Sequence, residues 1–372
     1  MMPYLTGEFG NPSSKSHSFG WKAEFAIEQS REQVAKILGA STREIIFTSG
    51  ATESNNLALW GVAQNFPGGH LITSEVEHKC VRETARLIGT RGWTATFLPV
   101  NQYGQVRVED LEAALRPNTF LISLMLANNE VGSLNPIAEI GKIAKARGII
   151  FHTDAAQAVG KIPVNVDQLG VDLLSLSAHK FYGPKGSGAL YVRRKNPRVE
   201  IKPLYMGGGQ EQGLRSGTHN VPGIVGLGAA CAIAEPKIVS EQKRLLGLRE
   251  KLWTTLQKGL GEVQLNGHPT ERLPGSLNVS FPFIESDSLV ASLSDIAVSS
   301  TSACMTAGAE PSYVLRAMGL SKDTIHSSIR VGIGRFNTEE EIDYTGKTII
   351  EKVEKLRASS PLYQLSIQGK KK

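Results

Sequence analysis

The sequence predicts an α/β fold, with a mostly parallel seven-stranded sheet between helices and a smaller α+β domain after it. Short apolar runs alternate with amphipathic runs from about residue 44 to residue 193, as in strands joined by helices. Polar residues follow several apolar runs directly, and ligands bind at the carboxyl ends of parallel strands. The expected strands are 44–48, 70–74, 94–100, 120–126, 149–153, 173–177 and 189–192, and the expected helices between them are 55–64, 79–89, 109–115 and 137–146.

A second domain is expected after the sheet. The triplet 207–209 is Gly-Gly-Gly, which marks a loop, and a long helical stretch then covers about 241–260. Strand-like runs at 277–281 and 296–299 and an amphipathic helix at 339–356 follow. We therefore predict a large domain over 1–238 and a small domain over 239–372.

The composition is that of a soluble globular protein. Of the 372 residues 41% are hydrophobic and 20% charged, which allows a sizeable core. No run of 18 apolar residues occurs, so no transmembrane helix and no membrane partner are expected. The first residues lack the pattern of a signal peptide, and the three cysteines match no metal spacing. These features predict a cytoplasmic protein with free thiols and no metal site.

The net charge of +6 does not by itself indicate nucleic-acid binding. No basic stripe with interleaved aromatic residues and no known binding motif is present. We expect the positive charge to attract anionic cofactors or acidic partner proteins.

Lys180 and Asp154 are the strongest candidates for chemistry. Lys180 follows an apolar run with Ser177 and His179 beside it, and a glycine-rich turn comes next. A lysine at such a place can form a Schiff base with a carbonyl cofactor, and the alternative is a solvated surface lysine. Asp154 ends a buried-looking strand, where a carboxylate needs a cationic or N–H partner. In a pyridoxal enzyme that partner is the ring nitrogen, and the alternative is a helix cap.

Three further positions have a functional and a structural interpretation each. The run 48–53 can cradle an anion at a helix N-terminus, or it can simply cap that helix. His78, which follows Glu77, can stack on an aromatic ring or move protons, or it can be structural. Arg330 can clamp a carboxylate with two hydrogen bonds, or it can form a surface ion pair.

The three cysteines differ in their surroundings. Cys304 lies among small polar residues in a loop over 299–308, where an exposed thiolate is available. Cys231 lies in an apolar helical run and Cys80 on an expected helix, so both are interpreted as structural.

These motifs together resemble the pyridoxal-phosphate-dependent cysteine desulfurases of fold type I in the class-V aminotransferase family, in particular the group I enzymes that supply sulfur for iron–sulfur cluster assembly. The resemblance runs over nearly the whole chain. It rests on TSGATES at 48–54, EHK at 77–79, NNEVG at 128–132, SAHKFYGPKG at 177–186, RSGT at 215–218, SSTSAC at 299–304 and EPSYVLRAMG at 310–319.

The resemblance implies a role for each matching residue. Lys180 would hold pyridoxal 5′-phosphate, Asp154 would pair with its ring nitrogen, and Cys304 would take sulfur from L-cysteine as a persulfide and leave alanine. Asn129 would contact the cofactor and, with Arg330, the substrate carboxylate. The other residues that the resemblance assigns to the cofactor are Ala51, Thr52, His78, Gln157, Ser177, His179 and, toward the neighbouring subunit, Thr218.

The implied partners are L-cysteine, a second copy of the chain in a homodimer, an iron–sulfur scaffold protein and other sulfur acceptors, which include tRNA-thiolation enzymes. Cys304 would also serve as a transient iron–sulfur ligand in a scaffold complex. The family carries a strand with an Asp and an Ala-Thr-Thr stretch well before the motif that begins here at Phe9. The sequence given does not contain this stretch, so the resemblance leaves the stability and the full activity of the chain open. A weakly active sulfur-relay subunit is one alternative. Selenocysteine lyase and pyridoxal-dependent aminotransferase are the others.

Overall fold

The computed structural model describes residues 1–300 and 311–370. These residues form two compact units. The large unit contains Met1–Pro99, Val106–Ala127 and Asn135–Val239. The small unit contains Val100–Gln105, Asn128–Leu134 and Ser240–Lys372. Two short segments of the first half of the chain, which include Asn128 and Asn129, thus belong to the small unit.

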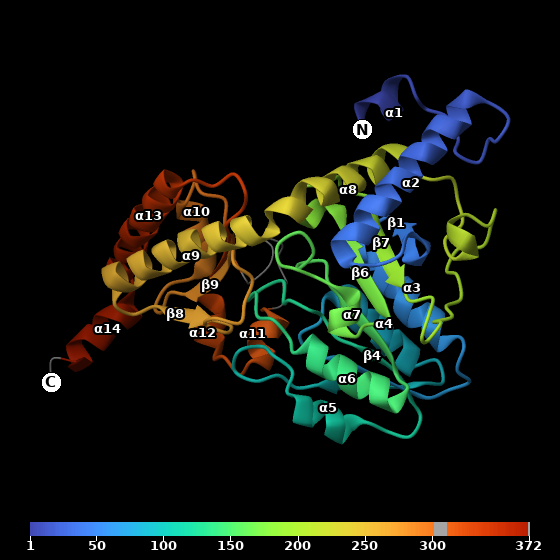
Figure 1. The fold of residues 1–372 in the computed structure, drawn as a ribbon. Coiled ribbons are helices and arrows are strands. Elements are labelled where there is room, and N and C mark those ends of the chain that lie inside the picture. The colour runs from blue at the N-terminus through green and yellow to red at the C-terminus, as the bar shows by residue number, and fades with distance from the viewer. Residues whose placement is uncertain (301–310, 371–372) are drawn as a thin grey trace. The chain divides into compact units, whose positions relative to one another are not determined.

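The large unit is built on a seven-stranded sheet (Figure 1). The strand order is β1-β7-β6-β5-β4-β2-β3, and only β7 runs antiparallel to its neighbours. The central strands are almost fully buried, as expected for a parallel sheet covered on both faces. The strands are β1 (Ile45–Thr48), β2 (His70–Ser74), β3 (Thr94–Leu98), β4 (Thr119–Ser123), β5 (Ile150–Asp154), β6 (Leu173–Ser177) and β7 (Gly188–Val192).

Helices flank this sheet (Figure 1). Helix α3 packs on β6 and β7, α4 on β2 and β3, and α6 on β5. Glycines in the left-handed conformation end α2 and α6, at Gly39 and Gly148. The helices are α1 (Met2–Thr6), α2 (Ser18–Leu38), α3 (Ala51–Ala63), α4 (Lys79–Gly89), α5 (Val108–Ala114), α6 (Ile137–Arg147), α7 (Val166–Leu169) and α8 (Val221–Ala234), with short 3-10 turns η1 (Thr42–Glu44), η2 (Ala178–Lys180), η3 (Glu211–Gly213) and η4 (Glu235–Lys237).

The small unit combines a four-stranded antiparallel sheet, in the order β10-β11-β9-β8, with helices. Its core joins Leu252 and Leu256 of α9 to Val279 of β9 and Val353 of α13. Helix α13 starts with a capping box between Thr338 and Glu341. The elements are α9 (Ile238–Leu260), β8 (Gln264–Asn266), β9 (Ser276–Ser280), α10 (Ser286–Ser292), β10 (Ser299–Ser300), α11 (Tyr313–Ala317), α12 (Lys322–His326), β11 (Ser328–Gly332), α13 (Glu339–Ala358) and α14 (Pro361–Lys370).

The predicted fold class is confirmed. Among the predicted elements, the helix expected at 55–64 begins earlier, at Ala51, the strand expected at 94–100 ends at Leu98, and two other strands also differ. The strand expected at 296–299 is wrong except at its end, because a turn closes there with the Ile296 N–H donating to the Leu293 carbonyl. Strand β4 ends at Ser123 rather than 126, although the Leu126 N–H still donates to the Asp154 carbonyl.

One stretch of the described chain, Val221–Leu260, is long and apolar enough to cross a membrane by length and composition alone. A core helix of a soluble protein passes the same test, so this is weak evidence for a span. The expectation that the protein has no membrane partner stays a prediction.

Candidate functional site

In the large unit, the predicted polar residues lie at the ends of β1, β2, β5 and β6 or directly after them. Asp154 is the last residue of β5 and Ser177 the last of β6. The two strands are parallel neighbours, with Asp154 opposite Ser175. Their carboxyl ends therefore form one edge, as the sequence pattern predicts.

Asp154 is buried at this edge, with 6% of its surface exposed. Its Oδ2 accepts a hydrogen bond from Asn55 Nδ2 at 2.7 Å, and its Oδ1 accepts one from the Ala156 N–H at 2.9 Å. Burial raises the pKa of Asp154, although these hydrogen bonds and the nearby charges of His78 and Lys180 act in the opposite direction. The carboxyl group retains lone pairs for a further donor.

Lys180 ends the short turn η2 directly after β6. Its side chain is exposed, whereas Ala178 and Phe181 on either side are buried and anchor the turn. Gly183 lies so close to Ala178 that a Cβ there would come within 2.8 Å of the Ala178 Cβ. The lysine is therefore carried by a tightly packed turn, and its charge acts on Asp154.

His78 caps helix α4 and contacts the thiol of Cys80, which the sequence pattern indicates to be structural. The His78 Nδ1 accepts from the Cys80 N–H at 3.3 Å and lies 3.0 Å from the Cys80 Sγ. Asn55 Nδ2, which binds Asp154, also lies 3.1 Å from this sulfur. A chain of contacts thus links Asp154, Asn55, Cys80 and His78. Burial and the charge of Asp154 raise the pKa of Cys80 to about 11, so it is a thiol at neutral pH.

Glu77 is a second residue whose role only the structure reveals. It is fully buried, and its Oε1 accepts from Ser74 Oγ at 2.9 Å and from the Met125 N–H at 2.8 Å. Burial raises its pKa to about 8, and the charge of Asp154 acts in the same direction. These bonds tie the loop that carries His78 to the end of β4.

The run 48–53 forms a cradle at the N-terminus of α3. Gly50 precedes the helix with φ 148°, and no side chain caps this end. Gly188 of β7 approaches so closely that a Cβ there would lie 2.6 Å from the Gly50 Cα. Ser177 Oγ and His179 Nδ1 form a hydrogen bond of 2.9 Å to each other, and a Cβ on Gly50 would lie 3.4 Å from that Oγ. The structure thus brings Ser177 and His179 to the α3 N-terminus at Ala51 and Thr52, a site suited to an anion.

Arg215 and Glu53 connect this cradle to a second loop. Arg215 Nε lies 2.9 Å from Glu53 Oε1, and the Ser49 N–H donates to Glu53 Oε2 at 2.8 Å. Burial acts to raise the pKa of Glu53, but these hydrogen bonds outweigh it and the pKa is lowered. The loop after η3 is therefore fixed to the start of α3.

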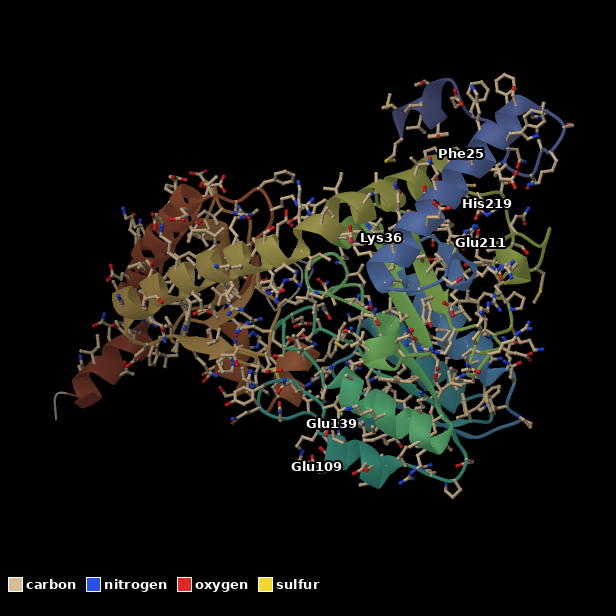
Figure 2. The ribbon with its side chains drawn as sticks, viewed as in Figure 1. Phe25, Lys36, Glu109, Glu139, Glu211 and His219 are labelled. Atoms are coloured by element: carbon tan, nitrogen blue, oxygen red, sulfur yellow. The ribbon has the colours of Figure 1, made fainter. Side chains whose placement is uncertain are left out.

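Thr218 lies exposed in the same loop, which a buried carboxylate holds in place. Glu211 accepts two hydrogen bonds from Arg31, at 2.8 and 2.9 Å. It also accepts from the Phe47 N–H at 2.7 Å and lies 2.7 Å from His219 Nε2. Figure 2 labels Glu211 and His219, which lie beside each other in the large unit. Burial acts to raise the pKa of Glu211, but the Arg31 and His219 bonds lower it to about 2.

Gln157, a predicted cofactor residue, has a side chain that is bonded to a residue outside the candidate site. It lies in the loop after β5, and its Oε1 accepts from Lys161 Nζ at 3.0 Å. A role for its amide would require it to exchange this partner.

In the small unit, Arg330 contacts the backbone of Asn129. Arg330 Nη1 donates to the Asn129 carbonyl oxygen at 2.8 Å. In the described part of the chain the Asn129 Oδ1 is buried and has no hydrogen-bond partner. The Asn128 Oδ1 accepts from the Glu130 and Val131 N–H groups and so fixes the backbone here. The Arg330 guanidinium, a group that suits a carboxylate ligand, thus lies against the Asn129 backbone.

Cys304, the predicted sulfur-carrying residue, lies outside the described residues. Strand β10 leads to it, with Ser299 opposite Arg330 on β11. Within residues 1–300 and 311–370 no group of three His, Cys, Asp or Glu side chains is arranged to hold a metal ion.

Comparison with known proteins agrees with this architecture. The aminotransferase class-V family matches residues 1–345. The chain is 52% identical to the human (Homo sapiens) cysteine desulfurase over 99% of its own length and 81% of that protein. It is 53% identical to the cysteine desulfurase IscS of Anaeromyxobacter sp. (strain Fw109-5), over 99% of its own length and 92% of that protein.

A solved structure of a NifS-like protein superposes with a TM-score of 0.88 at 41% identity, and covers 95% of this chain and 94% of the other. The chain belongs to the aminotransferase class-V family and, within it, to the cysteine desulfurases. The resemblance and the fold type inferred from the motifs are confirmed. The individual roles of the site residues stay predictions.

Proposed function

We propose that this protein is a pyridoxal 5′-phosphate-dependent cysteine desulfurase, which converts L-cysteine to L-alanine and transfers the sulfur to Cys304. One observation carries the proposal. Asp154 ends β5 and Lys180 follows the neighbouring strand β6, in a chain that is more than half identical to cysteine desulfurases. The buried carboxyl and the lysine are the two groups that such a cofactor requires on the protein side.

The residues present fit this cofactor. Asp154 is buried among neutral donors and has acceptor capacity for a protonated ring nitrogen. The uncapped start of α3, with Ser177 and His179, suits the phosphate, and a Cβ at Gly188 would close the cradle. When bound, the cofactor supplies an electron sink for cleavage of the carbon–sulfur bond.

Each residue then has a stated task. Asp154 would keep the ring nitrogen of the bound cofactor protonated, and Lys180 would hold its carbonyl carbon. Gln157 would contact the ring hydroxyl once it gives up its hydrogen bond from Lys161. His78 would cover the ring, with its orientation set by Cys80. Ala51, Thr52, Ser177 and His179 would hold the phosphate, and Thr218 would reach the phosphate of a second subunit.

Asn129 and Arg330 hold the carboxylate of L-cysteine and so fix the orientation of its thiol. The Cys304 thiolate attacks the substrate sulfur. The carbon–sulfur bond breaks, a sulfur–sulfur bond forms, and the substrate carbon takes up a proton, so that one L-cysteine and one enzyme thiol give one L-alanine and one enzyme persulfide. A soft thiolate nucleophile suits this step.

We infer a homodimer as the working form. The segment before and within α2 exposes large apolar side chains, among them Phe9 at 72%, Trp21 at 55% and Phe25 at 64% exposed. Figure 2 shows Phe25 on the outer side of α2. Apolar clusters of this kind on a soluble protein are typical of subunit interfaces. Phe25→Glu together with Trp21→Glu should give a monomer in light scattering, whereas Phe336→Glu, which changes another exposed ring, should leave the dimer intact.

The proposed acceptors of the persulfide are an iron–sulfur scaffold protein and other sulfur-accepting proteins, and the proposed location is the cytoplasm. In the described chain Cys80 and Cys231 are free thiols, which supports a reducing compartment.

The test is the release of alanine and sulfide from L-cysteine by the cofactor-loaded chain with a reductant. The proposal predicts equal amounts of both products, and loss of both in Lys180→Ala and in Cys304→Ala. Alanine formation that continues unchanged in Cys304→Ala would contradict the persulfide step. Lys185→Ala, at a nearby lysine of the same turn, is the matched control and should keep activity.

A further inference from the structure

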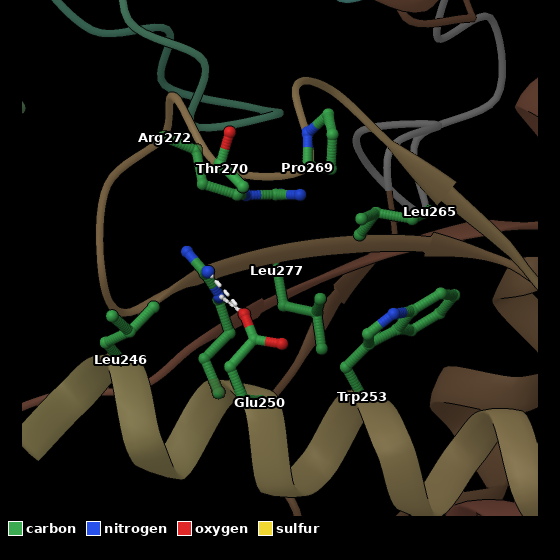
Figure 3. Close-up of a pocket in the computed structure, with 9 residues that line it drawn as sticks. Leu246, Glu250, Trp253, Leu265, Pro269, Thr270, Arg272 and Leu277 are labelled. Atoms are coloured by element: carbon green, nitrogen blue, oxygen red, sulfur yellow. Dashed lines mark hydrogen bonds and ion pairs between the residues drawn. The ribbon is translucent and has the colours of Figure 1, made fainter.

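The small unit contains a cavity of about 440 Å³ to which the proposed function assigns no role. It lies between α9 and the segment that joins β8 to β9 (Figure 3). Leu246 and Trp253 of α9 and Leu277 of β9 supply apolar walls. Its volume falls in the range of small-molecule sites, and an apolar lining with a few polar groups is typical of them.

The polar part of the lining is dominated by Arg272. This residue is 5% exposed, and Figure 3 shows it across the cavity from Glu250 and Trp253. Its Nη2 donates to the Val131 carbonyl oxygen at 2.8 Å. Within residues 1–300 and 311–370, its Nε and Nη1 are buried and have no hydrogen-bond partner. Burial and the charge of Arg249 lower the pKa of Arg272 to about 10, which still leaves it protonated at neutral pH.

A second buried guanidinium lines the same cavity. Arg249 is 3% exposed, and its Nη1 donates to the Leu273 carbonyl oxygen at 3.1 Å. Its Nε and Nη2 donate to Glu250 Oε1, at 3.2 and 2.5 Å. Glu250 is about half exposed, so water screens its charge more than the charges of the two arginines. Two buried cations therefore face one partly solvated carboxylate, and one positive charge is left over.

We propose that this cavity binds a small monocarboxylate that carries an apolar group. The carboxylate accepts hydrogen bonds from the donors of Arg272 and balances the excess charge, because guanidinium and carboxylate form strong charge-assisted bonds. The apolar group lies against Trp253, Leu246 and Leu277. A buried arginine with unsatisfied donors is costly, so the bound carboxylate stabilises the small unit.

The test is a ¹⁹F NMR titration of the full cofactor-loaded chain with 4-fluorobenzoate, with neutral 4-fluorobenzamide as the shape-matched control. Binding of one benzoate per chain is expected, with the amide weaker by about tenfold, because hydrogen bonds to charged groups are roughly twice as strong as neutral ones. Equal affinity for the acid and the amide would overturn the proposal, and so would the absence of benzoate binding at millimolar probe.

Three variants locate the site. Arg272→Met should abolish binding, with its folding checked by circular dichroism. Glu250→Gln removes a partly exposed competing carboxylate, so it should tighten binding several-fold, and this result does not depend on the folding of Arg272→Met. Arg330→Met should leave binding unchanged. Loss of binding in Arg330→Met, together with no effect of Glu250→Gln, would assign the benzoate to the Asn129–Arg330 pair and contradict the proposal.

Discussion

The buried carboxylate of Glu211 should be one of the strongest determinants of stability in the large unit. It accepts hydrogen bonds from both terminal nitrogens of Arg31 and from the Phe47 N–H, and contacts His219. Only 1% of its side chain is exposed. We predict that Glu211→Gln, which keeps the shape and removes the charge, destabilises the protein strongly because it leaves Arg31 buried beside a neutral group.

The magnitude follows from the structure in two ways. The pKa of Glu211 falls from 4.5 to about 2 on folding, which corresponds to about 3 kcal/mol, because a tenfold change in an equilibrium is about 1.4 kcal/mol. Breaking one partner of a buried ion pair costs about 3–5 kcal/mol. Because the pKa is lower in the folded state, this stability is present above pH 4.5 and is lost as the pH falls toward 2.

The assay is urea unfolding followed by circular dichroism at pH 7 and at several lower values. Glu235→Gln is the matched control, because Glu235 pairs with the exposed Lys36 (Figure 2) at 3.1 Å and such surface pairs contribute only about 0–1 kcal/mol. We expect a loss of about 3 kcal/mol in Glu211→Gln and a weaker dependence on acid than in the parent. If both variants unfold at the same urea concentration, the Arg31–Glu211 bridge is not the stabilising element inferred here.

Three further predictions concern the candidate site. Asn55→Leu removes a hydrogen-bond donor to Asp154 Oδ2, so the free energy of unfolding should fall by about 1–3 kcal/mol. The cofactor should also dissociate faster, as measured by absorbance after dilution. An unchanged rate of dissociation would contradict the role of Asn55. Gly188→Ala places a Cβ within 2.6 Å of the Gly50 Cα, so the melting temperature and the affinity for pyridoxal phosphate should both fall. Gly186→Ala is the control for affinity: no atom lies near its Cβ position, so it should have a smaller effect on the affinity. Cys80 and Cys231 have pKa values of about 11 and about 12, so both should react slowly with iodoacetamide at pH 8. At that pH only about one Cys80 thiol in a thousand is ionised. Rapid labelling of Cys80, measured by mass spectrometry, would show that its thiol is activated.

The residues at the strand ends could be predicted from sequence because their position follows from topology. An apolar run of strand length, followed at once by Asp154 or by Ser177 and Lys180, places those side chains at the carboxyl edge whatever the packing of the helices. The cradle before α3 is predictable for the same reason. Periodicity also located most strands to within one or two residues.

The supporting residues could not be predicted because their partners are distant in the chain. Asn55 lies within α3 and reads as an ordinary polar helix residue, yet its partner Asp154 is 99 positions away. Arg31 and Glu211 are 180 positions apart and meet only when α2 and the loop at η3 pack on β1. Cys80 was interpreted as a helix-face residue, and its contact with His78 depends on the cap geometry of α4. The one local signal for this contact is that His78, a candidate site residue, is also the residue that caps α4.

The most direct test of the central claim, that Lys180 and Asp154 define the cofactor site, is borohydride reduction of the loaded protein followed by peptide mass spectrometry. Reduction makes the bond between the lysine and the cofactor permanent, so the account predicts that the pyridoxyl group is found on Lys180 and that Asp154→Ala carries much less of it. A pyridoxyl group on any other lysine, with Lys180 unmodified, would contradict the account.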